Sequence, residues 1–108
     1  MERLPLRAEQ LLTLSSAGRR LSDLVAASRE PVHYEVLRHL LRVSEETMTE
    51  VLEETIRLQL VRRGDGPFTY VPFDENTGAK IAGEMGQERL ARLRQQIEGA
   101  TRRVFEVG

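Results

Sequence analysis

The spacing of apolar residues changes once along the chain, from a helical period to a strand period. From residue 32 to residue 59, apolar side chains recur three and four positions apart, which favours amphipathic helices. Residues 60–63 and 68–73 instead have the pattern of two short strands, and they flank the turn-forming segment Gly64-Asp65-Gly66-Pro67. The chain therefore predicts helices followed by a short β-hairpin.

Within the helical part, two helices are predicted on either side of a two-residue joint, Val43-Ser44. The first ends near Arg42. Ser44 is a suitable N-cap for the second, and Glu45 and Glu46 place negative charge at the positive end of the helix dipole. The second helix carries an apolar stripe at i, i+3, i+4, i+7 and i+8, made of Met48, Val51, Leu52, Thr55 and Ile56. This is the outline of a helix-turn-helix.

Further helices are predicted before and after this unit. Pro5–Ala17 forms the first, with Gly18 able to end it, and the next runs from about Arg19 to Arg29. Pro31 is well placed to open the helix that leads into the joint. After the hairpin, one long helix is predicted from about Thr77 to Val104.

These elements define the expected fold class: mainly α with a small β-hairpin wing, in a winged helix-turn-helix with a long C-terminal helix. A chain of 108 residues has room for one modest core. We assign residues 1–74 to the winged-helix domain, with the helix-turn-helix at about 32–59 and the wing at about 60–73. Residues 75–108 are expected to form a C-terminal helix that acts as a packing or dimerisation extension.

Composition excludes several classes of protein. The chain has no cysteine, so disulfides and thiolate metal sites are excluded. It has no apolar run approaching the roughly 18 residues that cross a bilayer, and its first residues lack the apolar stretch of a secretory signal. We therefore expect a cytoplasmic protein without a membrane partner. The formal net charge of −1 gives no overall basic field for nucleic acid.

Catalytic and metal-binding patterns are weak. His33 and His39 lie six positions apart, on different faces of a helix, and no carboxylate cluster completes a metal site around them. No serine has a base at a recognisable spacing. We therefore expect a protein that binds, with no enzyme activity, no metal and no cofactor.

The segment from Val36 to Arg63 resembles the general winged helix-turn-helix pattern. The order of Phe68–Phe73, Ile81, Met85 and Glu88–Ile97 resembles the winged-helix module that follows the ATPase core in bacterial STAND-type signalling ATPases and related large transcriptional activators. This resemblance implies a regulatory module that contacts neighbouring domains of a larger chain.

The chain departs from that family at two positions. Where the family often has a nucleotide-sensing histidine after the last aromatic of the wing, Asp74 follows Phe73. Arg94 stands where the last helix commonly has another histidine. A Walker-type Gly-Lys-Ser/Thr loop is also missing from the sequence, so the chain is not the ATPase itself.

The charges leave two kinds of partner open. In a DNA-binding winged helix the second helix of the motif enters the major groove, but here that helix is acidic. The residues expected to contact a protein are Glu45, Glu46, Glu50, Glu53 and Glu54. The alternative is a DNA-binding transcriptional regulator, with contacts from Arg38, Arg42, Thr47, Arg62 and Arg63. A continuous stripe of arginines beside the wing would favour DNA, and scattered arginines would favour protein.

The last predicted helix carries a stripe with the spacing of a coiled-coil seam. Its residues are Leu90, Leu93, Ile97, Ala100 and Val104. This stripe either forms the seam of a homodimer or packs back on its own domain, and the spacing alone does not decide between the two.

Overall fold

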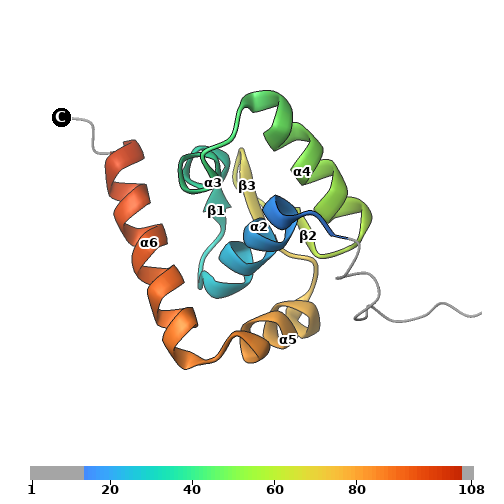
Figure 1. Cartoon of the computed structure of the whole chain (residues 1–108), viewed down its shortest axis with the longest axis vertical. Helices are drawn as coiled ribbons and strands as arrows, with labels where there is room; N and C mark the ends of the chain where they lie inside the picture. The colour runs from blue at the N-terminus through green and yellow to red at the C-terminus, as the bar shows by residue number, and fades with distance from the viewer. Residues whose placement is uncertain (1–13, 106–108) are drawn as a thin grey trace, which may run out of the picture.

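The structure is a computed structural model and describes residues 14–105 of the chain. It is mainly α-helical, with a small antiparallel sheet, a hairpin wing and a long C-terminal helix, which confirms the fold class predicted from the sequence (Figure 1). In chain order the elements are α2 (Ser16–Ala27), β1 (Val32–His33), α3 (Tyr34–Leu41), α4 (Glu45–Arg57), β2 (Val61–Arg63), β3 (Thr69–Pro72), α5 (Glu75–Met85) and α6 (Gln87–Phe105).

The helix-turn-helix consists of α3 and α4. Arg42 ends α3 in the left-handed conformation, with φ 56° and ψ 49°. Ser44 is the N-cap of α4, as predicted, because its Oγ accepts a hydrogen bond from the backbone N–H of Thr47 at 3.1 Å. Four residues of the predicted apolar stripe of α4 face inward, with Met48 fully buried, whereas Ile56 at the end of the stripe is exposed.

The wing is the predicted hairpin of β2 and β3, and a third strand completes the sheet. The strand order is β1-β3-β2, and both pairs are antiparallel. The prediction that the third helix opens at Pro31 is wrong, since Val32 pairs with Tyr70 in β1. His33 then caps α3 through Nδ1, which accepts a hydrogen bond from the backbone N–H of Glu35 at 3.0 Å. Pairing with the wing therefore overrides the helical signal at these two residues.

The predicted break at Gly18 is also wrong. Ser15 is the N-cap of α2, and its Oγ accepts a hydrogen bond from the backbone N–H of Gly18 at 3.0 Å, so the helix continues through the glycine. A Cβ at Gly18 would lie 2.5 Å from Oε1 of Glu54, so a larger residue there would displace the Glu54 side chain. Residues 5–13 of the first predicted helix lie outside the described residues.

The long helix predicted from Thr77 to Val104 is two helices. Gly86 separates α5 from α6 with φ +86°, a backbone conformation that side chains other than glycine's rarely adopt. Asp74 is the N-cap of α5 and accepts a hydrogen bond from the backbone N–H of Thr77 at 2.8 Å. The break allows α5 to pack on α2 while α6 packs on both α2 and α3.

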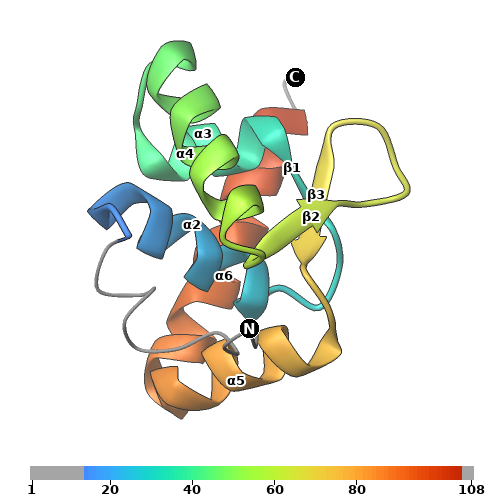
Figure 2. The same cartoon turned by 90° about the vertical axis from the view of Figure 1, so that its right-hand side faces the viewer.

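The core lies between α4 and α6, which are on opposite sides of the molecule in Figure 1. In Figure 2, α4 lies in front of the core and α6 behind it. Leu21 of α2 and Leu37 of α3 are fully buried at its centre. Ile81 of α5 and Leu93 of α6 belong to the same buried cluster. Among residues 14–105, no helix is long and apolar enough to cross a bilayer.

Candidate interaction surface

The outer face of α4 is acidic. Glu46, Glu50 and Glu53 follow one another at i, i+4 and i+7, so they lie along one line of the helix, and all are exposed. Glu45 is exposed beside them, with 76% of its side chain accessible, and its carboxylate lies 3.9 Å from the guanidinium of Arg38. None of the other three forms an ion pair with a residue in the described part of the chain. We call Glu45, Glu46, Glu50 and Glu53 the acidic face.

Glu54 differs from its neighbours on α4. Its carboxylate accepts hydrogen bonds from the backbone N–H of Ser15 at 3.0 Å and from the Ser15 hydroxyl at 2.6 Å. Both contacts hold the start of α2 against α4. Glu54 therefore has a structural role in this fold, which its neighbours on α4 do not share.

Three of the five residues proposed to contact DNA lie at the helix-turn-helix joint. Arg38 donates from Nε to the Val43 carbonyl at 3.4 Å, and its guanidinium also lies 3.9 Å from Glu35. The Thr47 hydroxyl is 3.2 Å from that of Ser44, within the N-cap of α4. Arg42 is exposed, but it is held in the left-handed conformation that ends α3. These three residues therefore have structural roles in the helix-turn-helix joint.

The other two DNA-contact candidates, Arg62 and Arg63, lie on β2 of the wing, and both are exposed. Arg62 donates from Nε to the Phe73 carbonyl and from a terminal nitrogen to the Arg63 carbonyl, both at 3.1 Å. The first of these hydrogen bonds ties β2 to the residue that follows β3, and the second lies within β2. Arg63 makes no side-chain hydrogen bond or ion pair within residues 14–105.

Arginines outside the wing also serve internal contacts. Arg20 of α2 donates to the Leu40 carbonyl at 3.2 Å. Arg89 of α6 pairs with Asp23 at 2.8 Å. Arg94 of α6 donates to the Ala27 carbonyl at 2.8 Å. These side chains fasten helices to one another on several sides of the core and do not gather beside the wing.

The stripe on α6 packs on its own domain. Leu93, Ile97 and Ala100 are buried in the core, and Leu90 and Val104 are half-buried against it. Because α6 packs on α2 and α3, the predicted dimer seam is covered within the monomer. Of the two alternatives left open by the spacing, the fold corresponds to internal packing.

The described residues contain no group of three or more His, Asp or Glu side chains that could hold a metal ion. His33 caps α3, and His39 is exposed on the same helix. A backbone hydrogen bond from Thr77 lowers the pKa of Asp74 below its usual 3.8, and this carboxylate serves as a helix cap. His33 and Asp74 therefore have local structural roles as helix caps.

The surface also has a groove that no sequence pattern predicts. A groove of about 710 Å³ lies between α6 and the segment of residues 28–33 that joins α2 to β1. Its lining comes from segments far apart in the chain, so neither helical nor strand periodicity points to it.

Comparisons of the chain with protein-family models, with curated proteins and with solved structures found no significant match.

Proposed function

We propose that this chain is a non-catalytic regulatory module that binds a protein partner through the acidic face of α4. The partner is a separate protein or a neighbouring domain of a larger chain, and it presents a basic surface. The observation that carries the proposal is the position of the acidic face, on the outer side of the second helix of a helix-turn-helix. Complementary charge is the usual way in which such a face selects and steers a partner.

The same position argues against DNA as the main partner. In a DNA-binding helix-turn-helix this helix lies in the major groove, close to phosphates. Glu46, Glu50 and Glu53 would bring three negative charges into that groove, and Arg57 at the end of α4 is the one basic residue of the helix. A glutamate can accept a hydrogen bond from a cytosine amino group, but a row of glutamates repels the backbone.

A DNA-binding regulator remains the alternative function, with the wing in place of α4 as the contact surface. Arg63 and Arg42 are the exposed candidates that favour it. The two hydrogen bonds of Arg62 to carbonyls and the ion pairs of Arg38 with Glu35 and Glu45 weigh against it, because they engage groups that phosphates would need. The resemblance to the winged-helix module of STAND-type ATPases is a further reason to expect contacts with neighbouring domains.

A titration with a basic probe tests the proposal. The probe is a fluorescein-labelled synthetic peptide rich in Arg and Lys, and binding is followed by fluorescence anisotropy. We expect the unmodified chain to bind it and the triple variant E46Q/E50Q/E53Q to bind several-fold more weakly, with the difference shrinking as salt rises. Glutamine and glutamate have similar helix propensities, so α4 is expected to stay folded.

The matched control is E75Q/E84Q/E88Q, which removes three exposed glutamates from α5 and α6 and changes the net charge equally. If the acidic face binds the peptide, this control retains most of the affinity. Equal weakening by the two triple variants would show that overall charge, and not the acidic face, attracts the peptide, and the proposal would fail.

A further inference from the structure

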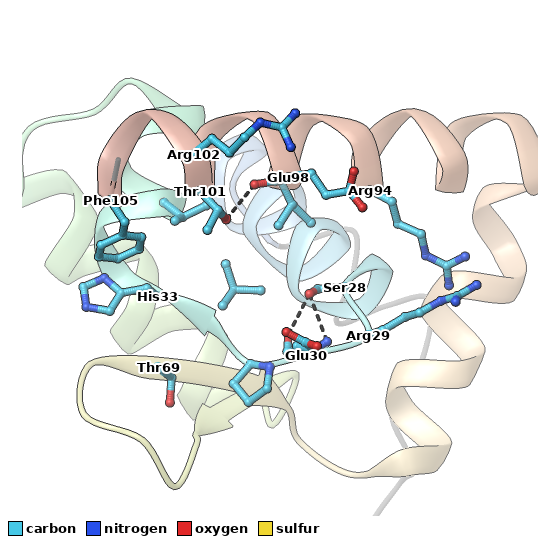
Figure 3. Close-up of a pocket in the computed structure, with 14 residues that line it drawn as sticks. Ser28, Arg29, Glu30, His33, Thr69, Arg94, Glu98, Thr101, Arg102 and Phe105 are labelled. Carbon is cyan, nitrogen blue, oxygen red and sulfur yellow. Dashed lines mark hydrogen bonds between the residues drawn. The ribbon is translucent and has the colours of Figure 1, made fainter. Parts of the chain in front are cut away.

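The groove beside α6 has an apolar floor. Val32 of β1 and Val36 of α3 are buried, and Ile97 of α6 closes the floor from the other side. The segment of residues 28–33 forms one wall and α6 forms the other (Figure 3). A volume of about 710 Å³ lies within the range of about 300–1,000 Å³ that is typical of small-molecule sites.

One end of the groove is basic. The guanidinium groups of Arg29 and Arg94 lie at this end (Figure 3). The hydrogen bond from Nε of Arg94 to the Ala27 carbonyl, at 2.8 Å, fixes the orientation of its guanidinium. Neither arginine has a carboxylate within ion-pair distance in the described part of the chain. Their terminal N–H groups are therefore available to an anion, for which the planar guanidinium is well suited.

The other end of the groove is aromatic. The rings of His33 and Phe105 meet edge to face, with centroids 5.0 Å apart. Phe105 is nevertheless 54% exposed, so much of its ring is open to a ligand. A groove with a basic end, an apolar floor and an aromatic end suits a molecule with a charged head and an apolar body.

A purely structural role explains only part of this arrangement. Arg94 satisfies a carbonyl at the C-terminus of α2, which is a common use of arginine. That role needs Nε alone, and it accounts for neither Arg29 nor the exposed ring of Phe105. Glu30 and Glu98 also line the groove, but neither forms an ion pair with its arginines in residues 14–105.

We propose that this groove binds a small organic anion with a carboxylate or phosphate head and an aromatic or aliphatic body. Arg29 and Arg94 hold the head, and the body lies along Val32 and Ile97 toward Phe105. Helix α6, which forms one wall of the groove, lies on the opposite side of the core from α4 (Figure 1). A module that binds a protein partner through α4 would then also bind a metabolite-sized ligand at a second, separate site.

Calorimetric titration with 2-naphthoate and with the neutral 2-naphthamide tests the site, because the two probes share a body and differ in charge. We expect 2-naphthoate to bind at least about tenfold more tightly than 2-naphthamide, because only the carboxylate forms charge-assisted hydrogen bonds with the two guanidinium groups. A parallel titration with 2-naphthyl phosphate distinguishes the two heads, and tighter binding of either one identifies the preferred ligand class.

The variant R29Q/R94Q should weaken 2-naphthoate binding at least about tenfold. The matched control R92Q/R103Q removes two exposed arginines of α6 outside the groove and should leave it unchanged. R29Q alone keeps the contact between Arg94 and Ala27, so it tests the head site even if the double variant is unstable. Thr101→Trp should block the groove from the α6 side.

The proposal is overturned if the amide binds as tightly as the carboxylate. It is also overturned if R92Q/R103Q weakens binding as much as folded R29Q/R94Q does, since general attraction of anions would then explain the result. Absence of saturable binding at millimolar 2-naphthoate and 2-naphthyl phosphate would have the same consequence.

Discussion

The acidic face of α4 and the basic end of the groove beside α6 differ in charge, and the two helices lie on opposite sides of one small core (Figure 1). On α4, the carboxylates come from neighbouring turns of a single helix. In the groove, Arg29 and Arg94 come from segments that are far apart in the chain and meet only in the folded protein. A formal net charge of −1 therefore conceals two local surfaces of different character, and position, more than total charge, determines which partner each one suits.

Within α4, neighbouring glutamates differ in whether the fold uses their side chains. Glu53 and Glu54 are neighbours in the sequence, but Glu54 binds Ser15 of α2 while Glu53 faces solvent. A glutamate that already serves the fold contributes little to a docking surface. Substitutions can therefore compare side chains that stabilise the fold with side chains that face solvent, both on α4 and beside α6.

The largest effect is expected at the floor of the groove. Ile97→Ala should lower the free energy of unfolding by about 2–3 kcal/mol, because Ile97 is only 8% exposed and its loss leaves a cavity. Ile56→Ala on α4 should cost less than about 1 kcal/mol, since Ile56 is 39% exposed. Urea denaturation measures both. Equal losses would contradict the description of α6 as part of the core and the outer side of α4 as a free surface.

The next largest effect on the free energy of unfolding is expected at Glu54, in contrast to its neighbour Glu53. Glu54→Ala should cost about 1 kcal/mol, because it removes two hydrogen bonds to Ser15 at a partly exposed site. Glu53→Ala should change stability by less than about 0.5 kcal/mol. A double-mutant cycle of Glu54→Ala with Ser15→Ala should show coupling. Additive losses would mean that the contact contributes nothing.

Gly86 determines where α6 begins and therefore where the groove lies. Gly86→Ala should lower stability by about 1 kcal/mol, because alanine is strained at φ +86°. Gly83→Ala, in the interior of α5 with nothing within 4 Å of the added Cβ, should raise stability by about 0.5 kcal/mol. Thermal melting compares the two. Stabilisation by both substitutions would indicate one continuous helix from α5 to α6.

The smallest effect concerns a carboxylate that belongs to neither surface. Hydrogen bonding from Thr77 lowers the pKa of Asp74 in the folded chain. The resulting stabilisation is complete above the ordinary pKa of about 4 and is lost as the pH falls through the lower folded value. Asp74→Asn keeps a capping side chain but does not titrate, so its Tm should vary less between neutral and acidic pH. Identical pH profiles of Tm would show that Asp74 does not contribute in this way.

The sequence predicts the parts of the molecule that depend on neighbouring residues. Ser44 as an N-cap, the turn around Gly64 and the acidic face of α4 all follow from local patterns, and the caps and turns agree with the fold. Each of these features is fixed within a few positions along the chain. Periodicity and capping rules therefore identify them directly.

The features that were missed depend on distant contacts. β1 exists because Val32 pairs with Tyr70 of the wing. Helix α2 runs through Gly18 because Ser15 caps its N-terminus, and Ser15 is held in turn by Glu54 of α4. The groove likewise needs Arg94 beside the end of α2. Gly86 is the exception. Because glycine is a recognised helix breaker, this residue is a local signal that the predicted long C-terminal helix consists of two helices.

Binding to duplex DNA at low salt tests the central claim most directly. Anisotropy with a labelled random-sequence duplex should show little binding by the unmodified chain, because the acidic face of α4 repels phosphate. The variant E46Q/E50Q/E53Q should bind the duplex more tightly than the unmodified chain, and the control E75Q/E84Q/E88Q should gain less. Tight, salt-sensitive binding of the duplex by the unmodified chain, abolished by R62A/R63A, would contradict the account and make the wing a DNA-binding surface.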